Sequence, residues 1–106
     1  MKRTALLVID PQNDYFEGGL FPLWNTQDTL ETILKAITHA QANDIPVVLI
    51  QHVADSSLGV APFFNPGTMG VEIHPQVLAL APNATVVMKH FADAFEQTEL
   101  NAVLSA

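Results

Sequence analysis

Three short apolar runs, each ending at a polar or turn-forming residue, are spaced along the chain. They cover residues 4–9 (TALLVI), 45–51 (IPVVLIQ) and 84–88 (ATVVM). Such continuous runs of aliphatic and β-branched residues are typical of strands that are buried on both faces. The first run ends at Asp10 and the third at Lys89. We therefore expect three buried strands, two of which end at a charged side chain.

Between the first two runs, apolar residues recur at helical spacing, which predicts an amphipathic helix. We expect Asn25 to cap the N-terminus of this helix, and Glu31 to pair with Lys35 one turn further on. Two more helices are expected, a short one around residues 76–80 and a last one that starts near Thr98.

The order strand, helix, strand, long connection, strand, helix is typical of a parallel sheet with helices on its faces. We therefore predict an α/β fold, with residues 1–106 forming a single domain. Two long loops are expected, an aromatic-rich one at residues 11–25 and one at residues 52–83; a connection as long as the second is usually functional. Because the chain ends inside the last predicted helix and three strands make a small sheet, we expect the sheet to be incomplete and the domain to be truncated at its C-terminus.

Charge and composition narrow the possible functions. The chain has 4 Lys and Arg against 11 Asp and Glu, a net charge of −7. It therefore has no basic patch for nucleic acid or for an anionic membrane, and we expect a small-molecule ligand. No apolar run approaches the length of a membrane span or of a signal-peptide core, so we expect a cytoplasmic protein. The chain contains no Cys, which excludes a thiol nucleophile within these 106 residues.

The two charges at strand ends are the candidate chemistry. Ligands of open α/β sheets bind outside the carboxyl ends of the strands, where Asp10 and Lys89 would both project. An acid and an ammonium group that lie close together there can remain ionised and can stabilise charge on a substrate. The plainer alternatives are a turn at Asp10-Pro11 and a solvated Lys after a strand, and position alone leaves them open.

The residues around these two charges resemble the isochorismatase-like cysteine hydrolases. Residues 10–16 (DPQNDYF) match that family's D-x-Q-N-D-[YF] motif. A second motif of the family, a strand-end lysine followed by an Ala-Phe pair, a Thr and a Leu, matches Lys89, Ala94-Phe95, Thr98 and Leu100. The resemblance covers the whole chain. It implies a three-layer α/β/α sandwich of Rossmann-like type around a mostly parallel sheet.

The same resemblance implies a function. The family cleaves amide-like, carbamoyl or vinyl-ether bonds of small molecules with an Asp-Lys-Cys triad. Asp10 would be the general base and Lys89 the supporting charge. The family's Cys follows the fourth strand, which this chain does not include, so the 106-residue chain is expected to be inactive. Family members commonly form oligomers, and the 14% charged content agrees with a covered interface, so we expect a homo-oligomer.

Aromatic residues of the loops are candidate substrate contacts, although loop aromatics often only anchor a loop to the core. The nicotinamidases of this family bind a metal through an Asp-x-His pair and a later His, and this pair is absent at Gln51-His52-Val53. We therefore expect no metal and no other cofactor, although His52, His74 and Asp55 could still converge on a metal. The candidate substrate-binding residues are Phe16, Trp24, His52, Phe63 and Phe64.

Two alternatives to a hydrolase fragment remain. The first is a non-catalytic homologue that binds a small molecule or assembles an oligomer, and the absence of Cys supports it. The second is a phosphorylation receiver domain, which the single Asp at the end of the first strand disfavours.

Overall fold

The sheet of the computed structural model, which describes residues 3–106, has three parallel strands in the order β1-β2-β3. The strands are β1 (Leu6–Ile9), β2 (Val47–His52) and β3 (Thr85–Lys89). The three predicted strands are therefore confirmed, with ends that shift by one or two residues. β2 begins just after Pro46, which has no backbone N–H to donate to a sheet ladder.

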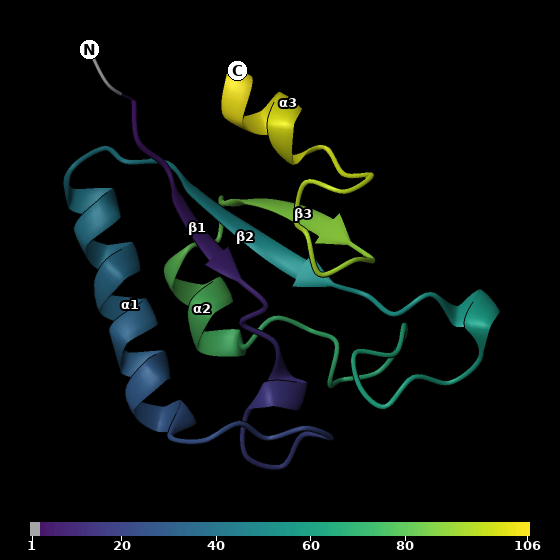
Figure 1. Cartoon of the computed structure of the whole chain (residues 1–106). Coiled ribbons are helices and arrows are strands. Elements are labelled where there is room, and N and C mark those ends of the chain that lie inside the picture. The colour runs from purple at the N-terminus through teal and green to yellow at the C-terminus, as the bar shows by residue number, and fades with distance from the viewer. Residues whose placement is uncertain (1–2) are drawn as a thin grey trace.

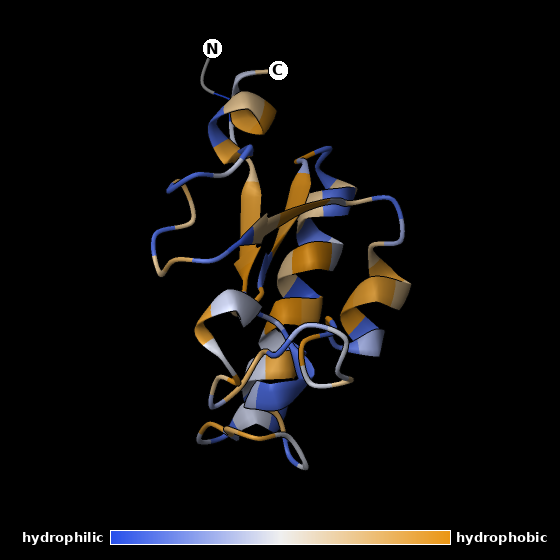
Figure 2. Cartoon of the chain, turned by 90° about the vertical axis from the view of Figure 1, so that its right-hand side faces the viewer, coloured by the Kyte–Doolittle hydropathy of each residue, from blue (hydrophilic) through white to orange (hydrophobic). Residues whose placement is uncertain are grey.

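Three α-helices lie on the two faces of this sheet (Figures 1 and 2). α1 (Thr26–Ala42) and α2 (Pro75–Leu80) cover one face, and α3 (Leu100–Ser105) lies on the other side. The predicted α/β class with a parallel sheet is confirmed. No helix among residues 3–106 is long and apolar enough to cross a membrane.

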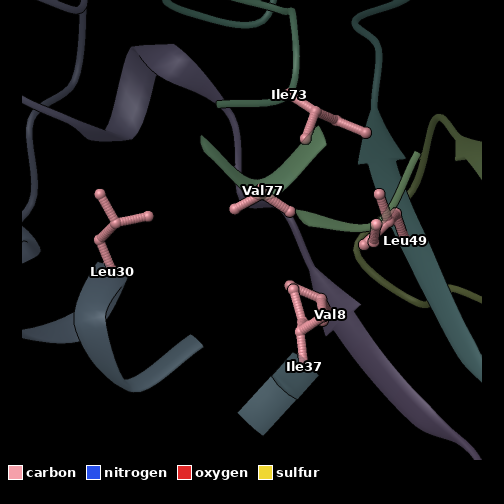
Figure 3. Close-up of a cluster of buried hydrophobic side chains, with 7 residues drawn as sticks. Val8, Leu30, Ile37, Leu49, Ile73 and Val77 are labelled. Carbon is pink, nitrogen blue, oxygen red and sulfur yellow. The ribbon is translucent and has the colours of Figure 1, made fainter. Parts of the chain in front are cut away.

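The main core lies between the sheet and the pair α1 and α2 (Figure 3). Alternate strand residues point to this face, and α1 presents residues one or two turns apart to it. Removal of these side chains from water is the main stabilising contribution, at about 1.5–3 kcal/mol for each large aliphatic side chain. The buried residues of this core are Val8, Leu30, Ile37, Leu49, Ile73, Val77 and Ala81.

The expectation that all three strands are buried on both faces is wrong at four positions, one of which is Thr85, exposed at the start of β3. Ile9 of β1 is 55% exposed, and Val86 and Met88 of β3 are 41% and 57% exposed. Val87, which alternates with the last two, is buried against Leu100 of α3. The strands consist mostly of hydrophobic residues (Figure 2), but the helices of the described chain cover each face of the sheet only in part.

Local details of the helices also differ from expectation. Asn25 precedes α1, but its backbone is left-handed (φ 56°) and its side chain makes no capping hydrogen bond. Glu31 and Lys35 form no ion pair; within residues 3–106 the only ion pair is Asp10–Lys89. The last helix begins at Leu100, whose N–H donates to the Thr98 hydroxyl at 3.2 Å.

The carboxyl ends of the three strands point to one end of the sheet, where two long loops gather (Figure 1). Loop 11–25 follows β1 and loop 53–74 follows β2. An antiparallel bridge between Gln12 and Ile73 joins the two loops. The fold thus brings both loops to the strand ends that carry the candidate charges.

A cavity in the main core should strongly destabilise the fold. Ile37 is fully buried, so Ile37→Ala is expected to lower the free energy of unfolding by about 2–5 kcal/mol, as measured by urea denaturation. Leu58→Ala is the control, because Leu58 is 87% exposed and its loss should change stability by no more than about 0.5 kcal/mol. Equal effects of the two substitutions would contradict this description of the core.

Candidate active site

Asp10 and Lys89 form an ion pair at the carboxyl ends of β1 and β3. Lys89 Nζ lies 3.5 Å from Asp10 Oδ2, and the two side chains are 3% and 17% exposed. The sheet register explains this meeting, because Ile9 pairs with Ile50 and His52 pairs with Lys89 across β2. Two residues 79 positions apart in the sequence are therefore neighbours in the fold.

The backbone of Asp10 turns its side chain out of the strand pattern. The Asp10 N–H continues the ladder by donating to Ile50 O at 2.9 Å, but its φ is 57°, in the left-handed region. Regular alternation would place Asp10 on the same face as Val8, which belongs to the α1 side. Aspartate tolerates the left-handed region better than most residues, and such backbone strain is common at functional sites.

Lys89 is almost fully buried and its ammonium group is held from two sides. Besides the carboxylate of Asp10, Nζ donates to Ala92 O at 3.0 Å in the segment that follows β3. A buried ammonium group is stable only when it is paired and hydrogen-bonded. Lys89 is therefore not a solvated strand-end residue.

One oxygen of the Asp10 carboxylate has no partner. Oδ1 is buried and accepts no hydrogen bond from any residue that the structure describes. An unsatisfied buried acceptor costs about 1–3 kcal/mol. This oxygen is chemically equipped to accept a proton or a hydrogen bond from a group that enters the site.

Gln12, two residues after Asp10, holds the end of β2 in place. Its side chain is fully buried; Nε2 donates to His52 O at 2.6 Å and to Val71 O at 2.8 Å, while Oε1 accepts from the His52 N–H at 2.8 Å. An amide side chain can make all three bonds because it both donates and accepts. Gln12 thus fixes the backbone of His52 beside Asp10 and Lys89.

His52 and Tyr15 are affected by the charges of the pair. Burial lowers the pKa of His52, and Lys89 lowers it further, against a smaller opposing effect of Asp10. Burial raises the pKa of Tyr15, and the negative charge of Asp10 adds to this effect. Both rings are therefore neutral near pH 7 and lie within electrostatic reach of the ion pair.

Aromatic rings gather next to His52. The ring of Phe64 lies 5.8 Å from that of His52 and 4.7 Å from that of Tyr15, and Phe63 lies 5.6 Å from Tyr15. These rings form an aromatic wall beside the ion pair. Phe64 is 1% exposed and lies behind the rings of His52 and Tyr15, whereas Phe63 is half-buried. The structure thus brings together three of the five predicted substrate-contact residues, His52, Phe63 and Phe64.

Phe16 and Trp24 are placed differently. Phe16 packs against the main core, and its ring lies 4.7 Å from that of His74. Trp24 is 89% exposed and shares no ring contact with the other described aromatic residues. Their assignment as substrate contacts remains a prediction from sequence.

No group of three or more His, Asp or Glu side chains within residues 3–106 is arranged to hold a metal ion. His74 instead caps α2, with Nδ1 accepting from the Gln76 N–H at 3.1 Å. Asp55 accepts hydrogen bonds from the backbone and hydroxyl of Ser57. These side chains are committed to local structure.

Sequence reasoning assigned no role to Gln12, Asp14, Tyr15 or Gly70. The first three lie inside the DPQNDYF motif, so the available signal was a cluster of polar residues directly after a buried strand. Gln12 and Asp14 are buried, Tyr15 lies within electrostatic reach of Asp10, and the Gly70 carbonyl accepts from the Asp14 N–H.

The chain is similar to known proteins of one family. The sequence profile of the isochorismatase domain matches residues 4–106. The isochorismatase family protein YddQ of Bacillus subtilis is 42% identical over 101 residues, which are 95% of this chain and 54% of that protein.

Solved structures give the same result. A crystal structure from Oleispira antarctica, assigned to the isochorismatase hydrolases, has a TM-score of 0.86 and 40% identity, over 97% of this chain and 55% of that one. A cysteine hydrolase from Pseudomonas syringae pv. phaseolicola has a TM-score of 0.83 and 28% identity, over 97% of this chain and 54% of that one. The chain spans about half the length of these relatives. With a profile match over nearly its whole length, the chain belongs to the isochorismatase family.

Proposed function

We propose that this chain supplies the Asp and Lys of an Asp-Lys-Cys active site in an isochorismatase-family hydrolase. Its substrate would be a small molecule with an amide, carbamoyl or vinyl-ether bond. The nucleophilic Cys would come from outside these 106 residues, which contain none, and the chain alone would be inactive. The observation that carries the proposal is the buried Asp10–Lys89 pair with its unpartnered Asp10 oxygen.

The proposed chemistry for an amide or carbamoyl substrate follows from these two groups. Asp10 takes the proton of the thiol, and the thiolate then attacks the substrate carbonyl carbon. The amine leaves with the proton that Asp10 took, and the acyl group stays on sulfur. Water then adds to this thioester and releases the acyl group as an acid, while a proton of the water restores the thiol. Lys89 supplies the positive charge that faces the Asp10 carboxylate, with Nζ 3.5 Å from Oδ2.

In this proposal, His52 provides an uncharged ring beside the Asp10–Lys89 pair. Its ring lies beside Phe64, and its lowered pKa keeps it uncharged near pH 7. A second cation next to Lys89 would weaken the hold of Lys89 on Asp10, because it would compete for the same carboxylate. A neutral His52 therefore preserves the ion pair.

A second candidate function is a non-catalytic homologue that binds a small molecule or assembles an oligomer. The observation that favours it is the absence of Cys from the 106 residues. The two candidates differ in one requirement, because only the hydrolase needs a thiol within reach of Asp10.

Replacement of either charge should abolish hydrolysis by the intact gene product. Asp10→Asn removes the base and Lys89→Met removes the supporting charge, so each should lower kcat by about 10²–10⁴-fold on the amide or carbamoyl compound that the unsubstituted protein hydrolyses best. Asp28→Asn, in the exposed first turn of α1, is the control and should retain full activity.

Alkylation of thiols should also abolish this activity. Hydrolysis that survives alkylation or Asp10→Asn would overturn the triad. An intact gene product without Cys that binds a small molecule would support the non-catalytic candidate instead. Circular dichroism separates lost chemistry from lost folding, because removal of one partner of a buried ion pair is itself destabilising.

The lowered pKa of His52 predicts a loss of stability in mild acid. The unfolded chain takes up the His52 proton at a higher pH than the folded chain, so the free energy of unfolding should fall as the pH drops below about 6.5. His52→Gln should make this fall shallower in urea titrations between about pH 7.5 and 5.5. His74, whose pKa burial also lowers, would account for part of the remaining slope. An identical slope with and without His52 would show that its ring is not buried as described.

A further inference from the structure

Asp14 carries a buried carboxylate that the proposed chemistry does not use. It is 1% exposed, and its two oxygens accept from two backbone N–H groups, Leu20 at 3.0 Å and Phe64 at 2.7 Å. It has no ion-pair partner within residues 3–106. Its charge is stabilised by these two hydrogen bonds, and bonds to a charged acceptor are stronger than those between neutral groups.

The bond to Leu20 stays within loop 11–25, whereas the bond to Phe64, 50 residues away, joins this loop to loop 53–74. The backbone of Asp14 adds further links, since its N–H donates to Gly70 O and its carbonyl accepts from the Phe21 N–H, both at 2.9 Å. Asp14 is therefore one of the points at which the two loops are fastened together, beside the Gln12–Ile73 bridge, and its carboxylate accepts from the Phe64 N–H.

The space around the Asp14 carboxylate is closed by Gly70. A Cβ at position 70 would overlap the carboxylate group itself. φ at Gly70 is not in the left-handed region, so the need for glycine arises from this close approach. The site is thus built around the carboxylate of Asp14.

The bond to Phe64 determines part of the wall of the candidate active site. Phe64 has a left-handed backbone (φ 61°), which bulky residues rarely adopt unless the surroundings hold them there. Asp14 holds its N–H, and the Ala54 N–H holds its carbonyl at 2.9 Å. In this position its ring packs against Tyr15 and His52.

We propose that Asp14 is a positioning residue, which fastens loop 53–74 to loop 11–25 and thereby sets Phe64 against the two rings beside the Asp10–Lys89 pair. The proposal rests on the proposed function only in naming this region as the active site. Asp14 acts on this wall through Phe64 and takes no part in bond cleavage.

The test follows the His52 ring by NMR during pH titration of the intact gene product, with His52→Gln used to assign its signal. Asp14→Asn replaces one carboxylate oxygen by an NH₂ group, which cannot accept a hydrogen bond from a backbone N–H. One of the two hydrogen bonds should therefore be lost and the loop that it holds should become free to move. The His52 pKa should then rise toward the ordinary histidine value, because Phe64 no longer covers the ring. Asp55→Asn is the matched control, since Asp55 also accepts from a backbone N–H in loop 53–74 but is exposed.

Gly70→Ala provides a second route to the same contact. Its methyl group should displace the Asp14 carboxylate and raise the His52 pKa as Asp14→Asn does. Gly70→Ala should also lower Tm strongly in the native background and only weakly in an Asp14→Ala background.

The proposal is wrong if folded Asp14→Asn protein shows an unchanged His52 titration, or if Gly70→Ala lowers Tm equally in both backgrounds. It is also wrong if Asp14→Asn and Gly70→Ala both fail to fold while Asp55→Asn folds, because Asp14 would then hold the whole fold. Neither readout requires turnover, so failure of the hydrolase proposal leaves this test intact.

Discussion

A largely buried acid and a buried ammonium group require each other at the carboxyl ends of the strands. Neither Asp10 nor Lys89 would be stable alone where it lies, because an unpaired buried charge is costly. Their meeting requires β1 and β3 to flank β2 in parallel, so that both strands end at the same level. The ion pair therefore depends on the complete topology of the sheet, and the two loops are arranged around it.

The parts of the fold that the sequence predicted follow from short-range patterns. Apolar runs located the three strands, and parallel strands that end together placed Asp10 and Lys89 at one edge. The exposure of Val86 and Met88 was not predictable in this way. An apolar residue in a strand indicates that a face can be covered, but the number of elements packed on that face is a property of the tertiary structure.

The parts that the sequence did not predict depend on contacts between distant residues or on weak local preferences. Gln12 and Asp14 lie within the motif, but the partners of the Gln12 side chain and the Phe64 partner of Asp14 lie 40 to 59 residues away, in segments whose path no periodicity describes. Asn25 has the composition of a helix cap, yet its left-handed backbone prevents the capping bond. The expected Glu31–Lys35 pair is of the exposed kind that contributes only about 0.3–0.5 kcal/mol, too little to fix two long side chains.

The hydrogen bonding of the site contains one conspicuous gap. The side chain of Gln12 makes three hydrogen bonds, Asp14 accepts two and Lys89 has two partners, so the polar groups around the strand ends are satisfied. Among the residues that the structure describes, the one buried side-chain oxygen or nitrogen without a partner is Asp10 Oδ1. In the proposed hydrolase, this oxygen of Asp10 is the acceptor available for the thiol proton.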